Sequence, residues 1–216
     1  MEVWKVSIEN VKAGDSIFTV PPLPPGDSTI MEIRSARSDD APAIARHIVM
    51  AETEMVQFFT GSQDPDAAKA VLESWVLSQT PCRYSTEFWL LADVAGQPAG
   101  SAISFPADQQ PELDAVLLDA LRRRGRSLPR LSPEGEPGTY YLSTMGVDPA
   151  FRGRGIGTAL MTAAEERGRQ LGFSRASLLV SRGKERAQAL YERQGYAVIA
   201  DVTIGGVAYR RMLKML

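Results

Sequence analysis

The sequence has too little cysteine and histidine for a disulfide framework or for a zinc site of the cysteine–histidine type. Cys82 is the single cysteine and His47 the single histidine among 216 residues. An intrachain disulfide therefore cannot form, and a Cys/His zinc cluster is excluded. We expect a protein without a metal, in a reducing compartment.

A large net charge and long apolar runs are also lacking. The chain has 24 basic and 26 acidic residues, a formal net charge of −2, so no overall field favours nucleic acid or an anionic membrane surface. The first residues, Met1–Lys5, are not a basic region followed by an apolar run, and no stretch is long enough to span a bilayer. We expect a cytoplasmic protein with neither nucleic-acid nor membrane partners, in which any anion site is local.

The composition that is present, 44% hydrophobic and 23% charged, is ordinary for a globular domain with an elaboration. Residues 21–27 (PPLPPGD) interrupt regular structure, so we predict an N-terminal arm and Pro-rich linker at 1–30 and a domain at 31–216. Residues 106–138 are predicted to be an insertion. It contains one helical face with Leu113 and Leu117, a solvated basic run at 122–124 and a Pro/Gly-rich exit.

Strand-like and helix-like patterns mix along the domain, which predicts a mixed α/β (α+β) fold. Helices are expected near residues 38–49, from Asp64 onwards, at about 158–172 and at 184–193. Strands are expected at 31–37, 88–94, 99–105, 140–147, 176–180, 196–201 and 207–212. The pairs 88–94 with 99–105 and 196–201 with 207–212 are predicted to be hairpins, with turns at 96–98 and 205–206.

Three glycines that alternate directly before a predicted helix point to an anion site. Gly153, Gly155 and Gly157 allow unusual dihedral angles and leave peptide N–H groups uncovered by side chains. The helix dipole adds about half a positive charge there, and Arg152 and Arg154 add full charges. A diphosphate would be stabilised at such a turn.

Two nucleotide fingerprints fail on these residues. The dinucleotide pattern G-x-G-x-x-G would need a third glycine, but counting from Gly153 or from Gly155 ends on Thr158 or Leu160. A Walker loop needs Ser or Thr after Gly-Lys, whereas Gly183-Lys184 is followed by Glu185. NAD and ATP are therefore disfavoured as ligands.

Residues 147–157 (VDPAFRGRGIG) match every defined position of V-x-P-x-x-R/Q-G-x-G-I/V-G, and AQALY at 187–191 with Gly195-Tyr196 matches A-x-x-L-Y-x-x-x-G-F/Y. On these two motifs the chain from about Met31 to Leu216 resembles the GNAT N-acyltransferase superfamily. The resemblance implies a central, mostly antiparallel mixed sheet flanked by helices. It also implies that the sheet is splayed between two central parallel strands, the first of which leaves its neighbour after a bulge and ends at Val147.

The resemblance further implies an acetyl-CoA-dependent N-acetyltransferase that transfers an acetyl group to an amine by direct attack. Pantetheine would pair with the open backbone of the splayed strand, and the pyrophosphate would lie on the amides of the glycine turn. The expected cofactor-binding residues are Met145, Gly146, Val147, Arg152, Gly153, Arg154, Gly155, Ile156, Gly157 and Thr158.

The resemblance assigns Tyr191 as the catalytic acid that protonates the leaving sulfur, although core packing of its ring is an alternative. Many members place a glutamate on the strand corresponding to 140–147, but this strand has no carboxylate. Glu52, Glu54 and Glu87 are candidates from elsewhere, and each is expected to be a solvated surface charge, so no base is assigned. Lys184 stands where many members have Asn.

The acceptor is expected to be a small-molecule amine. A protein N-terminus or lysine is an alternative, which would need an open groove, and a non-catalytic acyl-CoA-binding module is another. His47 is expected to be a buried, hydrogen-bonded structural residue. Phe58, Phe59 and Trp75 are expected to pack in the core, with an acceptor pocket as the alternative. If the chain forms an oligomer, a homodimer is the expected form.

Overall fold

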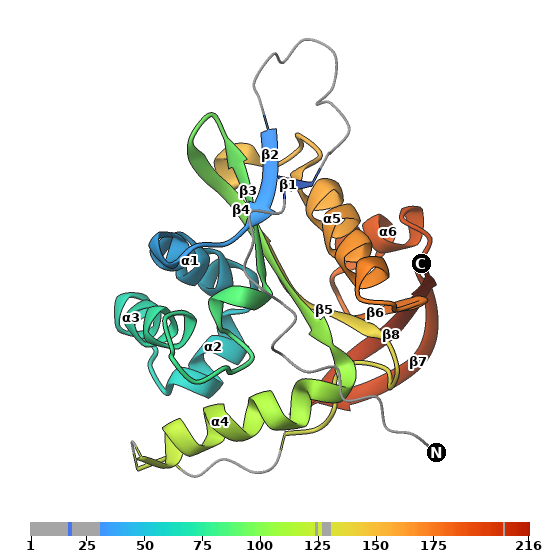
Figure 1. Cartoon of the computed structure of the whole chain (residues 1–216). Helices are drawn as coiled ribbons and strands as arrows, with labels where there is room; N and C mark the ends of the chain where they lie inside the picture. Colours follow the sequence, from blue (N-terminus) through green and yellow to red (C-terminus); the bar gives the residue numbers. More distant parts are fainter. Residues whose placement is uncertain (1–16, 19–30, 124, 127–130, 205) are drawn as a thin grey trace.

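The computed structural model describes residues 17–18, 31–123, 125–126, 131–204 and 206–216. They form a sheet with helices on both faces (Figure 1). Its strands are β1 (Ile17–Phe18), β2 (Met31–Ser35), β3 (Trp89–Val94), β4 (Gln97–Pro106), β5 (Tyr140–Val147), β6 (Arg175–Ser181), β7 (Ala197–Ile204) and β8 (Val207–Met215). The helices are α1 (Ala41–Ala51), α2 (Thr53–Thr60), α3 (Pro65–Val76), α4 (Gln110–Arg123), α5 (Ile156–Gln170) and α6 (Glu185–Arg193), with short 3-10 turns η2 (Ser38–Asp40), η3 (Thr86–Phe88), η4 (Ala107–Gln109) and η5 (Pro149–Phe151).

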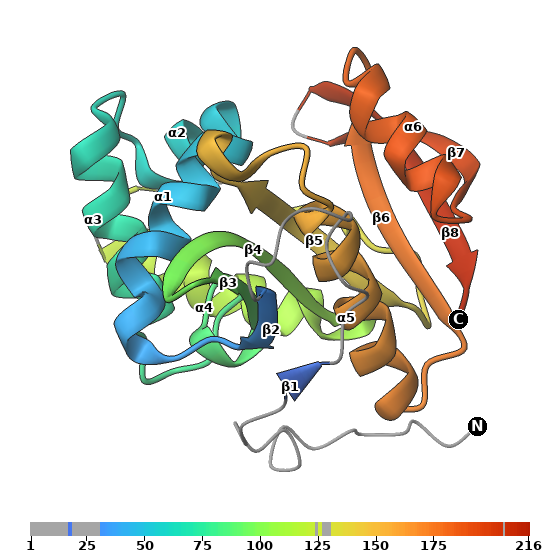
Figure 2. The same cartoon turned by 90° about the horizontal axis from the view of Figure 1, so that it is seen from above.

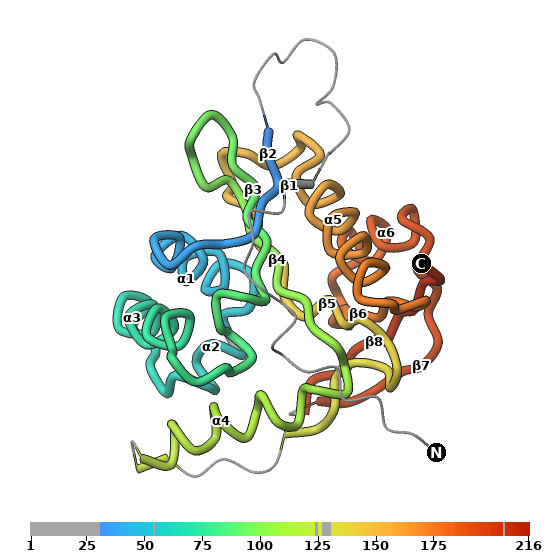
Figure 3. Tube along the Cα trace, in the orientation of Figure 1, coloured from blue at the N-terminus to red at the C-terminus, as the bar shows by residue number. Residues whose placement is uncertain are grey.

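The sheet has the strand order β1-β2-β3-β4-β5-β6-β8-β7. All neighbouring pairs are antiparallel except β5 and β6, which are parallel. This arrangement confirms the predicted mixed, mostly antiparallel sheet with one central parallel pair. Helix α5 is the crossover that joins the two parallel strands, as the trace in Figure 3 shows.

Local sequence signals explain where several elements begin. Helix α3 starts at Pro65, and the side chain of its N-cap residue Asp64 accepts a hydrogen bond from the amide of Asp66 at 3.1 Å. The turn between β3 and β4 is Ala95–Gly96, both with positive φ, which is the geometry of a two-residue hairpin. The predicted turn at 96–98 was therefore placed late, because Gln97 and Pro98 already belong to β4.

Apolar side chains bury both faces of the sheet. Helices α1, α3 and α4 pack against one face, where Phe105 of β4 and Tyr141 of β5 contribute to the largest buried cluster. Helix α5 covers the other face, with Leu160 and Ala164 fully buried against β3 and β4. The two helical layers lie on opposite sides of the sheet in Figure 1.

The segment predicted to be an insertion joins the core through α4. Leu113, Leu117 and Leu121 repeat at helical spacing and are buried in the largest cluster. Arg122 and Arg123 are exposed, as expected of a solvated run, while Arg124 lies outside the described residues. The division into an arm at 1–30 and a domain with an insertion stays a prediction. Of the arm, only β1 is described, and it pairs with Ile33 and Arg34 of β2.

Helix α2 was not predicted. It starts directly after Glu52, whose side chain makes no capping hydrogen bond, so the sequence carries no start signal there. Among the described residues, no helix is both long and apolar enough to cross a membrane.

Candidate functional site

Strands β5 and β6 separate partway along their length. They pair only where Tyr140–Leu142 faces Ala176–Leu178, and Figure 2 shows them diverging from there. On the other side of β5, the register with β4 skips Ser143, which is a β-bulge. Beyond it, residues 144–147 pair with β4 but not with β6. Their second backbone edge is therefore open to an added strand or an extended ligand.

The glycine turn follows at the end of this strand. Gly153 and Gly155 have φ values of +77° and +79°, and a Cβ built on either would meet nothing within 4 Å. The helical hydrogen bonds of α5 begin with the amide of Ala159 donating to Gly155 O at 3.0 Å. The amides of the first turn of α5 therefore have no intrahelical acceptor, so the turn fits an anion such as a diphosphate.

The two arginines of the turn have different neighbours. Arg152 Nε donates to the carbonyl of Val147 at 3.1 Å, which ties the turn to the end of β5. The guanidinium of Arg154 lies 5.4 Å from the centre of the Phe151 ring. Both remain close to the amides of the turn along the chain, and both add positive charge there.

The open edge, the glycine turn and α6 approach one another. A Cβ built on Gly157 would lie 3.6 Å from Met145 Cε and 3.9 Å from Leu190 Cδ2. Tyr191 follows Leu190 on α6 and packs beside Leu142 and Met145 against the buried cluster around Met161. The structure therefore brings the predicted cofactor-binding segments and the predicted acid into one region.

Tyr191 is partly buried, and its ring centre lies 6.4 Å from that of Tyr196. Burial, with a smaller contribution from the charge of Glu52, raises the pKa of Tyr191 to about 12. Its hydroxyl therefore keeps its proton at neutral pH. The ring shares in the core packing that the sequence pattern allowed for.

Glu52 corrects one expectation. It is partly buried where a solvated carboxylate was expected, and its Oε1 accepts a hydrogen bond from Thr144 Oγ1 at 2.9 Å. Burial raises the pKa of Glu52 to about 7, while the Thr144 hydrogen bond opposes this shift. Glu87 is partly exposed, and the side chain of Glu54 lies outside what the structure describes. Glu52 is thus the sequence candidate that reaches the splayed strand.

Lys184 is the N-cap residue of α6, and its side chain reaches the C-terminal end of α1. Its Nζ donates to the carbonyl of Ala51, the last residue of α1, at 3.3 Å. This contact connects α6, on the β6 side of the splay, with α1, on the β5 side. It also brings a positive charge near Glu52, whose pKa it lowers.

A buried ion network was not predicted. Arg83 Nε lies 2.7 Å from Asp114 Oδ1, and Arg83 Nη2 lies 2.8 Å from Glu134 Oε1. Tyr141 Oη donates to Glu134 Oε2 at 2.9 Å, and Gln110 Nε2 donates to Asp114 Oδ2 at 3.1 Å. Burial disfavours the charge of Arg83, but the two carboxylates outweigh it and raise its pKa. The sequence carried no local signal of this network, because Arg83 is 31 residues from Asp114 and 51 from Glu134.

His47, Phe59 and Trp75 are buried, as expected, whereas Phe58 is 38% exposed, so the expectation that it packs in the core was wrong. His47 is buried, with Nδ1 3.1 Å from Ser101 Oγ. Burial and, to a lesser extent, the charge of Arg46 lower the pKa of His47 to about 4. Phe59 and Trp75 are buried and pack on Tyr84, with ring centres 6.3 Å and 5.7 Å away.

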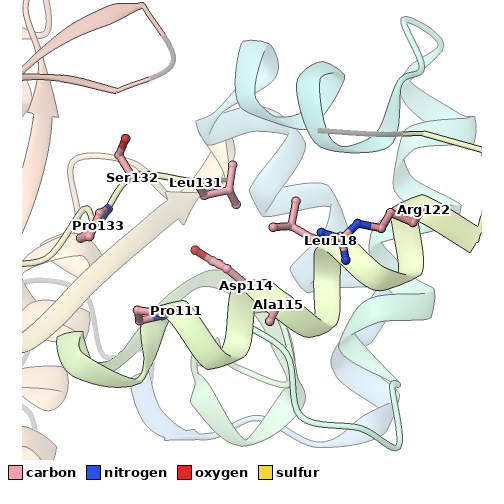
Figure 4. Close-up of a pocket in the computed structure, with 8 residues that line it drawn as sticks. All are labelled: Pro111, Asp114, Ala115, Leu118, Arg122, Leu131, Ser132 and Pro133. Atoms are coloured by element: carbon pink, nitrogen blue, oxygen red, sulfur yellow. The ribbon is translucent and has the colours of Figure 1, made fainter. Parts of the chain in front are cut away.

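A separate cavity of about 650 Å³ lies between α4 and residues 131–133 (Figure 4). Leu118, Leu131 and Pro133 give it apolar walls, and Asp114 links it to the network of Arg83. Within the described ranges, no group of three or more His, Cys, Asp or Glu side chains is arranged to hold a metal ion.

Comparison with known proteins agrees with this geometry. The family model described as the acetyltransferase (GNAT) family matches residues 48–196, which contain the open strand, the glycine turn and Tyr191. A solved acetyltransferase superposes with a TM-score of 0.70 at 28% identity, covering 85% of this chain and 98% of the other. An N-acetyltransferase of Staphylococcus aureus also has a TM-score of 0.70, at 22% identity over 84% of this chain and 98% of that one.

Two curated relatives share a short stretch with the chain. A mycothiol acetyltransferase of Propionibacterium freudenreichii is 40% identical over 68 residues, which are 31% of this chain and 21% of the relative. One of Beutenbergia cavernae is 40% identical over 68 residues, 32% of this chain and 22% of the relative. The match therefore spans about a fifth of the length of these relatives.

Proposed function

The chain belongs to the GNAT acetyltransferase family, an acyltransferase family that generally uses acetyl-CoA, and from this premise we propose that it acetylates a primary amine of a small molecule. The observation that carries the proposal is the placement of the open edge of β5 beside the glycine turn and Tyr191. These three features supply a backbone edge, an anion site and a proton donor.

The residues proposed to hold the cofactor form two groups. Backbone groups of the open edge bind the extended pantetheine arm as a neighbouring strand would, because their hydrogen-bonding groups are not used by β6. Amides of the turn bind the diphosphate, with the dipole of α5 and two arginines adding positive charge. The first group is Met145, Gly146 and Val147, and the second is Arg152, Gly153, Arg154, Gly155, Ile156, Gly157 and Thr158.

Tyr191 is proposed to be the catalytic acid. Bound acetyl-CoA supplies an activated carbonyl and a thiolate leaving group. Because its pKa is raised to about 12, Tyr191 keeps its proton at neutral pH and can donate a hydrogen bond to the developing negative charge on the sulfur, along which the proton passes as the C–S bond breaks. Its place on α6, packed against the same buried cluster as Met145 of the open strand, supports this role.

A small acceptor is supported by how residues 106–138 are fastened. The carbonyls of Phe58 and Phe59 on α2 accept hydrogen bonds from Arg126, which follows α4. The exit of the segment is tied to β8, because Arg211 donates to the carbonyl of Glu134 at 3.1 Å and pairs with Glu136 at 3.1 Å. We infer that a segment anchored at both ends leaves less room for a polypeptide acceptor than for a small amine.

Calorimetry with CoA, followed by a screen of primary amines with acetyl-CoA that detects free thiol, tests the proposal. We expect CoA to bind and Tyr191→Phe to lower kcat by about 10²-fold or more, with little change in CoA affinity. No measurable CoA binding would refute the cofactor assignment. Transfer to peptides and not to small amines would favour a protein acetyltransferase, and binding without transfer would favour an acyl-CoA-binding module. Full turnover in Tyr191→Phe would remove that residue from the chemistry.

A further inference from the structure

Glu52 lies directly after α1, and its carboxylate accepts a hydrogen bond from Thr144 of the open strand. We propose that Glu52 is the general base that deprotonates the amine, held for this task by a hydrogen bond from Thr144. This role rests on the proposed function, since it requires an amine acceptor. The proposed base lies between helices α1 and α2. It takes the place of a carboxylate on β5, which has none.

The backbone of Glu52 is fixed from both sides. Its amide donates to Ile48 O of α1 at 3.0 Å, and its carbonyl accepts from the amide of Val56 in α2 at 2.9 Å. Its dihedral angles, φ −141° and ψ 56°, are not helical, so the chain bends here and α2 starts anew. The side chain at this bend reaches Thr144 of β5.

The carboxylate is held by one oxygen and free at the other. Thr144 Oγ1 donates to Oε1 at 2.9 Å, while Oε2 has no hydrogen-bond partner in the part of the chain that the structure describes. Thr144 directly follows the bulge at Ser143, where β5 loses β6 as a neighbour. Oε2 of Glu52 is therefore available to another partner, while Oε1 holds the carboxylate at the start of the open edge.

Several charged or titratable groups face Glu52. The network of Arg83 and Glu134 lies on one side of it, Lys184 approaches from α6, and the charge of Glu52 also acts on Tyr191. The charge of Glu52 also contributes to raising the pKa values of two buried tyrosines, Tyr84 and Tyr141. The proposed base at the end of α1 is thus close enough to the proposed acid on α6 for its charge to raise the pKa of that tyrosine.

The proton count of the transfer closes with these two residues. The amine enters as an ammonium with a pKa of about 10.4 and must lose a proton before its lone pair can attack. As the C–N bond forms and the C–S bond breaks, the nitrogen loses two protons in all, and the thiolate gains one from Tyr191. Glu52 takes up a proton of the nitrogen and passes it to solvent. The second proton restores Tyr191, so one proton is released per turnover.

The pH dependence of kcat/KM tests the proposal, measured with acetyl-CoA and two amines of different basicity found by the screen. Burial raises the pKa of Glu52 to about 7, so we expect the rate to rise with pH through an acid limb near 7. A limb that stays in place for both amines belongs to the protein. Glu52→Gln should lower kcat by about 10²-fold or more and remove the limb, with CoA affinity unchanged. The matched control is Glu87→Gln, a partly exposed carboxylate outside these contacts.

Thr144→Val separates positioning from catalysis. Its hydroxyl stabilises the charged form of Glu52, so its loss should move the acid limb to higher pH by about one unit while the limb itself persists. Transfer by the wild type with an unchanged rate and pH profile in Glu52→Gln would overturn the role of Glu52 alone. Absence of transfer to any amine despite CoA binding would overturn the proposed function and this role together.

Discussion

Replacing Glu52 by Gln should stabilise the folded protein at neutral and alkaline pH. The pKa of Glu52 is about 7 in the folded chain, against an ordinary value of 4.5. Between these values the folded state binds more protons than the unfolded state, so the contribution of this group to stability falls as pH rises from 4.5 to 7. At ~1.4 kcal/mol per pKa unit, ionised Glu52 costs the fold about 3 kcal/mol above pH 7, as an upper bound.

Glutamine keeps the shape of the protonated carboxyl and cannot ionise. The free energy of unfolding of Glu52→Gln, relative to the wild type, should therefore grow from near zero at pH 4.5 to as much as about 3 kcal/mol at pH 8. Urea unfolding at several pH values, with the m value constant, measures this difference. Glu87→Gln is the control, which measures how the loss of one partly exposed acidic group changes the free energy of unfolding.

His47 makes the same experiment sharper, because its effect has the opposite sign. Its pKa is lowered to about 4 from 6.5, so the unfolded state binds more protons between these values and stability falls as pH falls. In the wild type the contributions of Glu52 and His47 oppose each other between pH 4.5 and 6.5. The variant keeps only that of His47, and its stability should rise more steeply with pH. A difference between variant and wild type that is independent of pH would refute the reasoning.

Two further substitutions test the scaffold of the site by urea unfolding and CoA calorimetry. Gly146→Ala would place a Cβ 2.6 Å from the backbone carbonyl of His47, so we expect a loss of about 1–3 kcal/mol and weaker CoA binding, because α1 and β5 must separate; unchanged stability would contradict the close approach. Arg83→Met should lose about 3–5 kcal/mol because Asp114 and Glu134 stay buried without their cation. Adding Asp114→Asn and Glu134→Gln should recover part of this loss, and no recovery would argue against the network.

The geometry of the glycine turn could be predicted because it depends on neighbouring residues alone. Adjacent residues alone predict a backbone with positive φ at Gly153 and Gly155 followed by a helix. The structure has both features. The divergence of β5 from β6 after a bulge followed from the family resemblance and is confirmed, and the structure places the bulge at Ser143. Periodicity located most strands and helices, because buried faces repeat at the spacing of their element.

The rest could not be predicted because it depends on contacts between distant segments. Glu52 and Thr144 are 92 residues apart, and Arg83 and Glu134 are 51 apart. Nothing next to Glu52 indicates burial, since its environment is created where the chain bends after α1 and Glu52 meets Thr144 of β5. A carboxylate without a local partner is ordinarily a surface charge, which is why the sequence alone gave the wrong environment for this residue.

The location of Glu52 follows from how β5 uses its α1-facing positions. Tyr141 is committed to Glu134 through its hydroxyl, and Gly146 must lack a side chain because the carbonyl of His47 lies against it. Only Thr144 is left between them, and its side chain is short. A carboxylate that is to reach this space must come from another element, and the end of α1 is anchored to the same strand by the contact at Gly146. The close packing of α1 on β5 that leaves no room for a glutamate on the strand is therefore what brings Glu52 to β5. The burial that raises the pKa of Glu52 to about 7 also makes its ionised form costly to the stability of the fold.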